Sequence, residues 1–427
     1  MIGQLPLGRA RSKGGPLFSL GSRWRLSDVC LLLFFAAMFG NRTGVGFDYV
    51  FLRGTFAAYV AVSFFCDVLP VEVGRRKGVG QKLFDGFVGW LAAFIALVYV
   101  SCFWSESVAN TLVSNYITNF IQALCLVALI NYRVQSRDDL YHLLTMFVLA
   151  AAYGMVMLLI KTPSSAWGSE RVGGALGLNA NDVGLGMSFA MLFSLFLARN
   201  RRQPLYYALS AAFIAVALFS GSRKAALLCI AGLVLVMAFS YKGAKGVVVT
   251  LVAIAAALGI YWAAMNVPEL YNVLGRRIES LLIDGGSDRS SLEREWYREY
   301  ARGMFIDKPL LGYGFNGFLT QMQAINYSHQ AYSHCNQWEL LADLGLVGFC
   351  LYYGAFVWMG VSFARSLRFK REDAFFGIVF LALIFVFDYG YVSFISPDTY
   401  IYLVLLYCLQ KILRREGAKD AKVEKVF

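Results

Sequence analysis

Residues 246–264 read GVVVTLVAIAAALGIYWAA, a stretch without a charged side chain. A helix of this length crosses the hydrocarbon core of a bilayer, and it pairs its own backbone groups, as every span in lipid must. Similar stretches recur along the chain. About twelve are predicted, with starts near Asp28, Asp48, Phe84, Asn110, Leu140, Asp182, Gln203, Arg223, Gly246, Asn336, Ala374 and Pro397. The pattern predicts an all-α fold, a polytopic membrane protein of about 12 transmembrane helices.

Composition supports the same fold class. The chain of 427 residues is 58% hydrophobic and only 15% charged, and its mean hydropathy is +0.57. These values are too apolar for a soluble protein of this size. We therefore expect residues 1–427 to form a single membrane domain.

Lysine and arginine predict the orientation. Most of the 39 cationic residues fall in alternate segments between the predicted spans, which indicates that both termini are cytoplasmic. The short outer loops hold only Arg42, Lys161, Arg171, Arg223 and Lys224. The net charge of +12 then reflects topology and contact with anionic membrane lipids. The sequence offers no soluble basic face, so we expect no nucleic-acid partner.

One outer segment, residues 264–335, is much longer than the other loops, and long loops in compact proteins are usually functional. Ser290 and Glu293 have the spacing of a capping box, which predicts a helix from Ser291 to about Phe305. An apolar face of Leu292, Trp296, Tyr300 and Met304 would lie along the outer membrane surface, and Glu295 and Arg298 would pair on the exposed side.

Cations on the outer side suggest an anionic ligand. Arg223 and Lys224 open the predicted eighth span, at the positive end of the helix dipole and against the positive-inside rule. A helix N-terminus flanked by arginine is suited to bind phosphate. Arg289 precedes the loop helix, and Arg171 begins a glycine-containing loop in which Asn179 offers a hydrogen bond. The alternative for Arg223 and Lys224 is a side chain that contacts lipid phosphate at the outer interface, and the alternative for Arg171 is an ordinary loop cation.

A proton acceptor is predicted beside these cations. His329 and His334 end the long loop, and a helix is expected to start near His334. The helix dipole would lower the pKa of the His334 imidazole and favour its neutral, basic form. The alternative is a histidine that only caps the helix. Tyr313, in the glycine-rich turn 308–317, is a candidate substrate contact. Asp284 and Asp288 are interpreted as a polar turn, so no metal site is expected.

Four blocks of the sequence resemble the O-antigen ligase and O-antigen polymerase family. HCNQWELLADLGLVGF from His334 resembles its histidine helix, with Gly345 eleven residues on, a spacing that favours His334 over His329. SGSRKAALL around Arg223 resembles its arginine motif. RSSLEREWYREYARGMFIDKPLLGYGFNGF from Arg289 resembles its outer-loop block, and RVGGALGLNANDVGLGM from Arg171 a fourth, weaker one. The similarity extends from Arg171 to Tyr353.

The resemblance implies a glycosyltransferase in the bacterial inner (plasma) membrane, with its active site on the periplasmic side. Such an enzyme moves a glycan from undecaprenyl diphosphate to an acceptor hydroxyl. His334 would be the catalytic base, Arg223, Arg289 and Arg171 would bind the diphosphate, and Asn179, Lys224 and Tyr313 would contact substrate. Inversion at the anomeric carbon is expected, with neither a metal nor another cofactor.

The acceptor stays open at this stage. A polymerase, the first hypothesis, extends a lipid-linked glycan for O-antigen or exopolysaccharide, and a chain-length regulator protein would then be a partner. A ligase transfers the glycan to lipid A–core in lipopolysaccharide biosynthesis, and an oligosaccharyltransferase modifies protein. A secondary transporter, such as a lipid-linked sugar flippase, is the alternative of another class. The long loop after the ninth span breaks the two-fold repeat that is typical of transporters.

Overall fold

The structure, a computed structural model, describes residues 24–42, 49–69, 83–106, 111–241, 243–283, 289–325 and 332–424. The described residues form helices and contain no strand beyond one isolated bridge, between Trp167 and Glu170. The longer helices are α1 (Leu26–Arg42), α2 (Tyr49–Val62, continued by η1, Ser63–Val68), α5 (Gly86–Ser101), α6 (Thr111–Arg133), α7 (Arg137–Lys161), α8 (Ala180–Arg201), α9 (Pro204–Phe219), α10 (Arg223–Ser240), α11 (Gly243–Asn266), α14 (Arg289–Asp307), α16 (Asn336–Ser366), α17 (Arg371–Asp388) and α18 (Pro397–Glu424). Short helices are η2 (Ser164–Ala166), η3 (Gly174–Leu176), α12 (Pro268–Leu270), η4 (Tyr271–Gly275), α13 (Arg276–Ile283) and α15 (Gly317–Ile325).

Each predicted apolar stretch coincides with a helix. Among the described residues, five helices are long and apolar enough to cross a membrane, namely Tyr49–Val68, Arg137–Lys161, Ala180–Arg201, Gly243–Asn266 and Asn336–Ser366. The chain is therefore a helical membrane protein, whereas the total of twelve spans stays a prediction. Some helices begin a turn before the predicted start, because their first turn is charged. In α7 that turn is capped by Ser136, whose hydroxyl accepts from the backbone N–H of Asp139.

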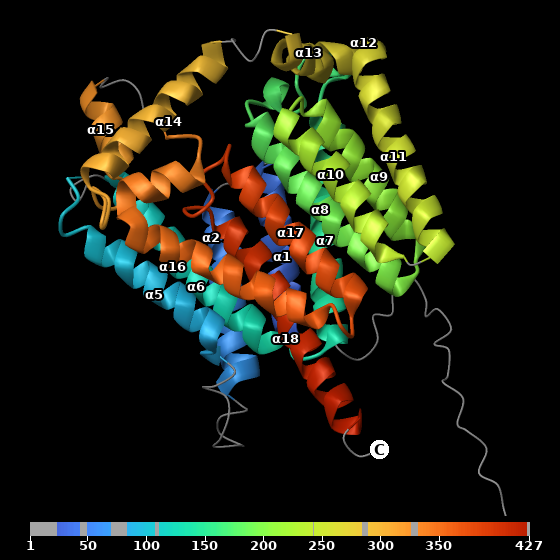
Figure 1. The fold of residues 1–427 in the computed structure, drawn as a ribbon, viewed down its shortest axis with the longest axis horizontal. Helices are drawn as coiled ribbons and strands as arrows, with labels where there is room; N and C mark the ends of the chain where they lie inside the picture. The colour runs from blue at the N-terminus through green and yellow to red at the C-terminus, as the bar shows by residue number, and fades with distance from the viewer. Residues whose placement is uncertain are drawn as a thin grey trace, which may run out of the picture.

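The central helix of the bundle is α8. Of its most apolar stretch, 89% is buried inside the protein, against 11% for α11 at the edge of the bundle (Figure 1). Helix α8 packs on α7, α9 and α10. A helix that is apolar on all sides is expected in such a central position. The exposed apolar face of α11 is expected to lie against lipid.

Helices α12 to α15 gather at one end of the bundle, which we call the loop end (Figure 1). The predicted loop helix is present as α14, which begins two residues before the predicted start, so that Ser290 lies inside the helix. Leu292 and Trp296 of the predicted membrane-facing stripe are exposed. Tyr297, Ala301 and Met304 form the face that packs on α15 and α16, a contact that the sequence pattern does not contain.

A break in α16 holds the glycine-rich turn. Gly345 adopts φ 62° and ψ −164° within the helix, a conformation that favours glycine. The N–H groups of Leu346 and Val347 donate to the carbonyls of Pro309 (2.8 Å) and Leu310 (3.2 Å). A Cβ on Gly345 would lie 2.3 Å from the Leu310 oxygen, so this close approach requires glycine.

The buried carboxylate of Asp343 fixes the other side of the turn. It accepts hydrogen bonds from the backbone N–H groups of Asn316 (3.1 Å) and Phe318 (2.7 Å), at the start of α15. The carbonyl of Asp343 accepts from the N–H of Gly314 at 2.8 Å. The turn and the first segment of α16 therefore form one unit, which positions the residues just before α16.

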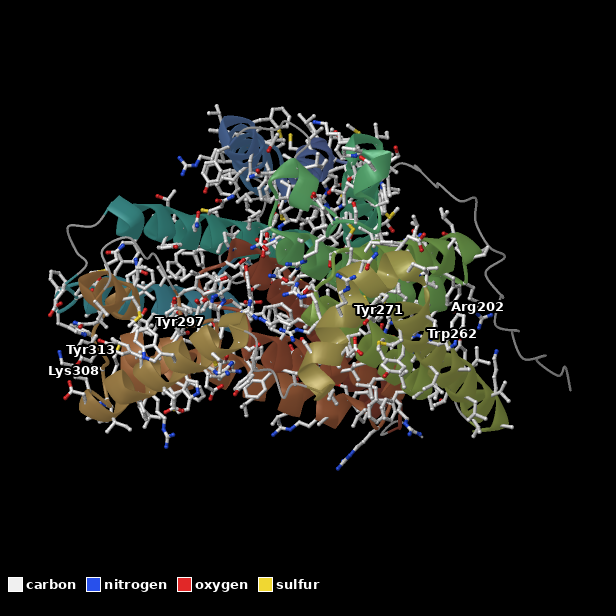
Figure 2. All side chains as sticks on the ribbon, turned by 90° about the horizontal axis from the view of Figure 1, so that it is seen from above. Arg202, Trp262, Tyr271, Tyr297, Lys308 and Tyr313 are labelled. Atoms are coloured by element: carbon white, nitrogen blue, oxygen red, sulfur yellow. The ribbon has the colours of Figure 1, made fainter. Side chains whose placement is uncertain are left out.

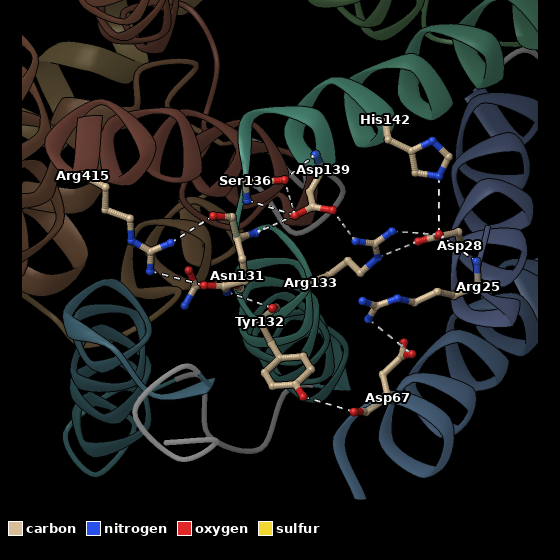
Figure 3. Close-up of polar contacts among 11 residues, drawn as sticks. Arg25, Asp28, Asp67, Asn131, Tyr132, Arg133, Ser136, Asp139, His142 and Arg415 are labelled. Atoms are coloured by element: carbon tan, nitrogen blue, oxygen red, sulfur yellow. Dashed lines mark hydrogen bonds and ion pairs between the residues drawn. The ribbon is translucent and has the colours of Figure 1, made fainter. Parts of the chain in front are cut away.

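The opposite end of the bundle carries paired charges. Arg133 of α6 contacts Asp28 of α1 at 2.9 Å and Asp139 of α7 at 2.9 Å, as Figure 3 shows. His142 contacts Asp28 at 3.4 Å. Three helices are thus joined through one buried aspartate.

Candidate functional site: a cationic cavity at the loop end

A cavity of about 610 Å³ lies where α10, α14, α17 and the segment before α16 meet. The polar part of its lining is formed by Lys224, Ser291, Arg294, Glu295, Arg298 and His334. The apolar part of its lining is formed by Leu227, Leu228, Leu292, Leu383, Val386 and Phe387. The cavity can therefore accommodate a ligand with an anionic part and an apolar part.

The start of α10 brings Lys224 into the cavity. Ser222 caps the helix, because its hydroxyl accepts from the N–H of Ala225. Gly221 before it adopts φ +61°, and a Cβ there would lie 2.4 Å from the carbonyl oxygen of Val273. Lys224 donates from Nζ to the Gly390 carbonyl, beyond the end of α17. The predicted helix start at Ser222–Arg223 is confirmed.

Helix α14 supplies two arginines that the sequence analysis did not single out. Arg294 and Arg298 lie one helical turn apart, so both side chains reach the same wall of the cavity. Arg298 forms the predicted ion pair with Glu295, and its guanidinium lies 5.1 Å from the ring centroid of Tyr389. The spacing Ser291–Arg294–Glu295–Arg298, one polar stripe of a helix, is the signal that could have identified them.

His334 occupies a constrained position. It is a non-glycine residue with φ +57°, a conformation that costs free energy and persists only when the surroundings enforce it. The imidazole lies 4.1 Å from the ring centroid of Tyr332 and 6.2 Å from that of Tyr297. The helix begins two residues later, at Asn336, with Cys335 at the N-cap position.

Buried polar groups hold the backbone on both sides of His334. The carboxylate of Glu339 accepts from the N–H of Ser333 at 2.6 Å. The amide oxygen of Asn336 accepts from the N–H groups of Ser393 (2.7 Å) and Phe394 (2.8 Å), which precede α18. These contacts tie the histidine to two separate parts of the bundle. Glu339 and Asn336 were not predicted as functional residues.

The imidazole is held in its neutral form. The pKa of His334 is lowered from 6.5 to about 4. Burial is the main cause, and the charges of Arg294, Lys224 and Arg298 add to it. The predicted direction of the pKa shift is therefore confirmed. The causes are burial and neighbouring cations, whereas the sequence argument relied on the helix dipole.

Arg171 and Arg223 stand beside the cavity, outside its lining. Arg171 donates to the Ser220 carbonyl (2.8 Å) and to the Asn181 side chain (2.8 Å). Burial lowers the pKa of Arg171 to about 10, with smaller contributions from Arg277, Arg294 and Arg223. Arg223 donates to the Arg277 carbonyl at 3.2 Å. The charges of Arg294 and Arg223 thus act on Arg171, which indicates that Arg171 lies close to the cations of the cavity wall.

The remaining predicted site residues are not brought to the cavity. The Asn179 side chain is exposed and caps α8, where it accepts from the N–H of Asn181 at 3.1 Å. Tyr313 donates to Asp307 at 2.6 Å and lies under the Lys308 ammonium, near one edge of the molecule (Figure 2). The side chain of Arg289, and all of His329, Asp284 and Asp288, lie outside the described residues. Among described residues, no group of three or more metal-ligating side chains occurs.

The fold and the cavity define a helical membrane protein with a histidine and several cations around one amphiphilic pocket. A family model described as O-antigen ligase matches residues 208–353. The match supports the predicted resemblance to the O-antigen ligase and polymerase family over this part of the chain. The matched region includes Arg223, Arg294, Arg298 and His334 but begins after Arg171 and Asn179. No curated protein matches the chain significantly.

Proposed function

We propose that the protein is a glycosyltransferase that moves a glycan from undecaprenyl diphosphate to an acceptor hydroxyl. The observation that carries the proposal is the neutral imidazole of His334 in a cavity lined by Lys224, Arg294 and Arg298. A base beside a cluster of cations suits a reaction in which a hydroxyl attacks and a diphosphate leaves.

The cations have the chemistry that the leaving group requires. Breaking the bond between the anomeric carbon and the diphosphate oxygen places negative charge on the diphosphate. Arg294 and Lys224 lie at the cavity wall, and Arg223 and Arg171 lie behind them. Guanidinium groups bind phosphate oxygens in pairs of hydrogen bonds. The diphosphate site is thus assigned to α10 and α14, and Arg294 joins the predicted set of Arg223, Arg171 and Arg289.

We assign to His334 the role of general base, which accepts the proton of the acceptor hydroxyl. As the acceptor oxygen bonds to the anomeric carbon, its proton moves to the imidazole, and undecaprenyl diphosphate departs from the opposite face. The product is inverted at the anomeric carbon, and these steps involve no metal. The apolar wall of Leu227, Leu383 and Val386 suits the isoprenoid part of the donor.

The loop end is assigned to the periplasm, with both termini cytoplasmic and the bundle in the bacterial inner membrane. The support is the charge distribution, because most lysine and arginine residues fall in alternate segments between the predicted spans. The described members Arg133, Arg137 and Arg199 lie at the end of the bundle opposite the loop end. The proposed active site then faces the compartment in which lipid-linked glycans are assembled.

Polymerisation of O-antigen or exopolysaccharide is the proposed reaction, and ligation to lipid A–core is the second candidate. The family model that matches is described as O-antigen ligase, which favours the second candidate. A deletion strain separates them. Single-repeat glycan on the core indicates a polymerase, whereas polymer that stays on its lipid carrier indicates a ligase.

His334→Ala tests the proposal. Purified protein in detergent, with lipid-linked donor and acceptor, should lose transfer by about 10²–10⁴-fold, the usual contribution of a general base. His142→Gln, at the opposite end, is the control and should keep nearly normal turnover. Normal transfer by His334→Ala would remove His334 from catalysis, and wild-type protein that makes no product in detergent would favour a transporter instead.

A further inference from the structure

A second groove lies at the end of the bundle opposite the catalytic cavity. It has a volume of about 410 Å³ and is formed where α10 ends, α11 begins and α17 begins. Tyr241, Gly243, Gly246 and Arg371 lie at its polar part. Helix α10 starts at the catalytic cavity with Lys224 and ends beside this groove, so the length of a membrane-spanning helix separates the two sites.

Two exposed cations stand at this groove. The guanidinium of Arg371, which lines it, lies 5.3 Å from the ring centroid of Phe375. The ammonium of Lys245 lies 5.0 Å from the ring centroid of Tyr241, a lining residue. Contacts with ring faces orient cations without neutralising them. Within the described part of the chain, neither cation forms an ion pair, unlike Arg137 and Arg199 nearby, which both contact Asp373.

The groove continues into an apolar surface. Val247, Thr250 and Leu251 of α11 line its other part. Val247 and Leu251 are about as exposed as Val252 and Leu258 further along the same helix, at 59–64%. A ligand bound here would thus meet cations at the helix ends and aliphatic side chains along the helix. Free phosphate would use only the first part, whereas a membrane lipid would use both.

We propose that this groove binds one anionic phospholipid, with its headgroup phosphate at Arg371 and Lys245 and an acyl chain along Val247 and Leu251. Basic pockets at the ends of transmembrane helices are suited to such headgroups. Gly243 leaves room for the glycerol region, because a Cβ at this position would meet nothing within 4 Å. The site is separate from the proposed reaction and does not depend on it.

The test is native mass spectrometry of the purified full-length protein with phosphatidylglycerol or phosphatidylethanolamine of the same chain length. Wild-type protein should retain one phosphatidylglycerol in preference to phosphatidylethanolamine. The double variant Arg371→Gln/Lys245→Gln should weaken that retention about tenfold or more, because each cation near a phosphate contributes substantially. Thr250→Trp keeps both cations and fills the apolar part, and it should weaken retention as well.

The matched control is Arg365→Gln/Arg368→Gln, which removes the same charge from exposed positions outside the groove. An equal loss in this control would show general electrostatic attraction and overturn the proposal. Displacement of the lipid by inorganic phosphate alone, or normal retention by Thr250→Trp, would show that the acyl chain does not bind along α11 and would also overturn it.

Discussion

The two ends of the helix bundle use the same types of cationic residue in different ways. At the end opposite the loop end, Arg133 is paired with Asp28 and Asp139, and Arg137 is paired with Asp373 and Glu416. At the loop end, Lys224 and Arg294 form no ion pair within the described part of the chain, and they line a cavity. Cations matched by carboxylates join helices, whereas cations gathered without them leave their charge for a ligand.

This difference is sharpest at the two places where arginines converge. Asp373 forms ion pairs with both Arg137 and Arg199, so two helices, α7 and α8, are joined to α17 through a buried carboxylate. At the loop end, burial lowers the pKa of Arg171, and the charges of Arg277, Arg294 and Arg223 lower it further. Their accumulation has an electrostatic cost, which a bound diphosphate would offset.

Among the variants that compare the two ends, the largest effect is expected from Arg294→Gln. Loss of a guanidinium from the cavity should lower kcat/KM for the lipid-linked donor by about 100-fold, the range found for charge-stabilising groups. Arg302→Gln is the matched control, because Arg302 lies on the same helix but contacts exposed Glu299 at 3.7 Å. Equal activities of the two variants would contradict a special role for the cavity.

Gly345→Ala should destabilise the unit that carries the histidine. A Cβ would clash with the Leu310 carbonyl, and the φ of +62° is strained for alanine, so we expect a loss of about 2 kcal/mol or more. Thermal unfolding in detergent measures it. Gly354→Ala in the same helix meets nothing within 4 Å and should be neutral or gain up to about 1 kcal/mol. Equal melting temperatures of the two variants would contradict the close packing of the glycine-rich turn against the break in α16 at Gly345.

Asp373→Asn tests the paired end. Arg137 and Arg199 would lose their shared carboxylate, which should cost about 1–2 kcal/mol of stability because the three groups are largely buried. The turnover of the folded enzyme should not change. A fall in kcat without a lower melting temperature would show that this end contributes to the reaction.

The smallest effect concerns pH. The neutral imidazole is the base, so activity should rise as pH increases through about 4 and then level off. Arg298→Gln removes one of the cations that lower the pKa of His334. The acidic limb should then move to higher pH, by about half a unit, because burial remains the main cause. A profile of kcat from pH 3.5 to 8 measures the shift, and a limb near 6.5 in the wild type would contradict the burial of His334.

Periodicity and charge were sufficient to predict the helices. The predicted start at Arg223, the Glu295–Arg298 pair and the choice of His334 all follow from local patterns, such as capping residues, helical spacing and a histidine near a helix start. The face of α14 that packs on the bundle was not predicted, because Tyr297 and Ala301 are selected by contact with α15 and α16. Tyr313 was predicted as a substrate contact from the turn around it, and this role stays a prediction for a residue whose hydroxyl donates to Asp307.

The sequence by itself determined that this chain is a bundle of apolar helices with cations stranded in one long loop, because hydrophobicity, capping and charge act over neighbouring residues. Only the tertiary structure decided which cations meet. Lys224, Arg294 and His334 belong to three different elements, and their convergence depends on how α14 packs on α16 and how the Gly345 break receives the turn. Such contacts join residues far apart in the chain, and no local pattern encodes the distance between them.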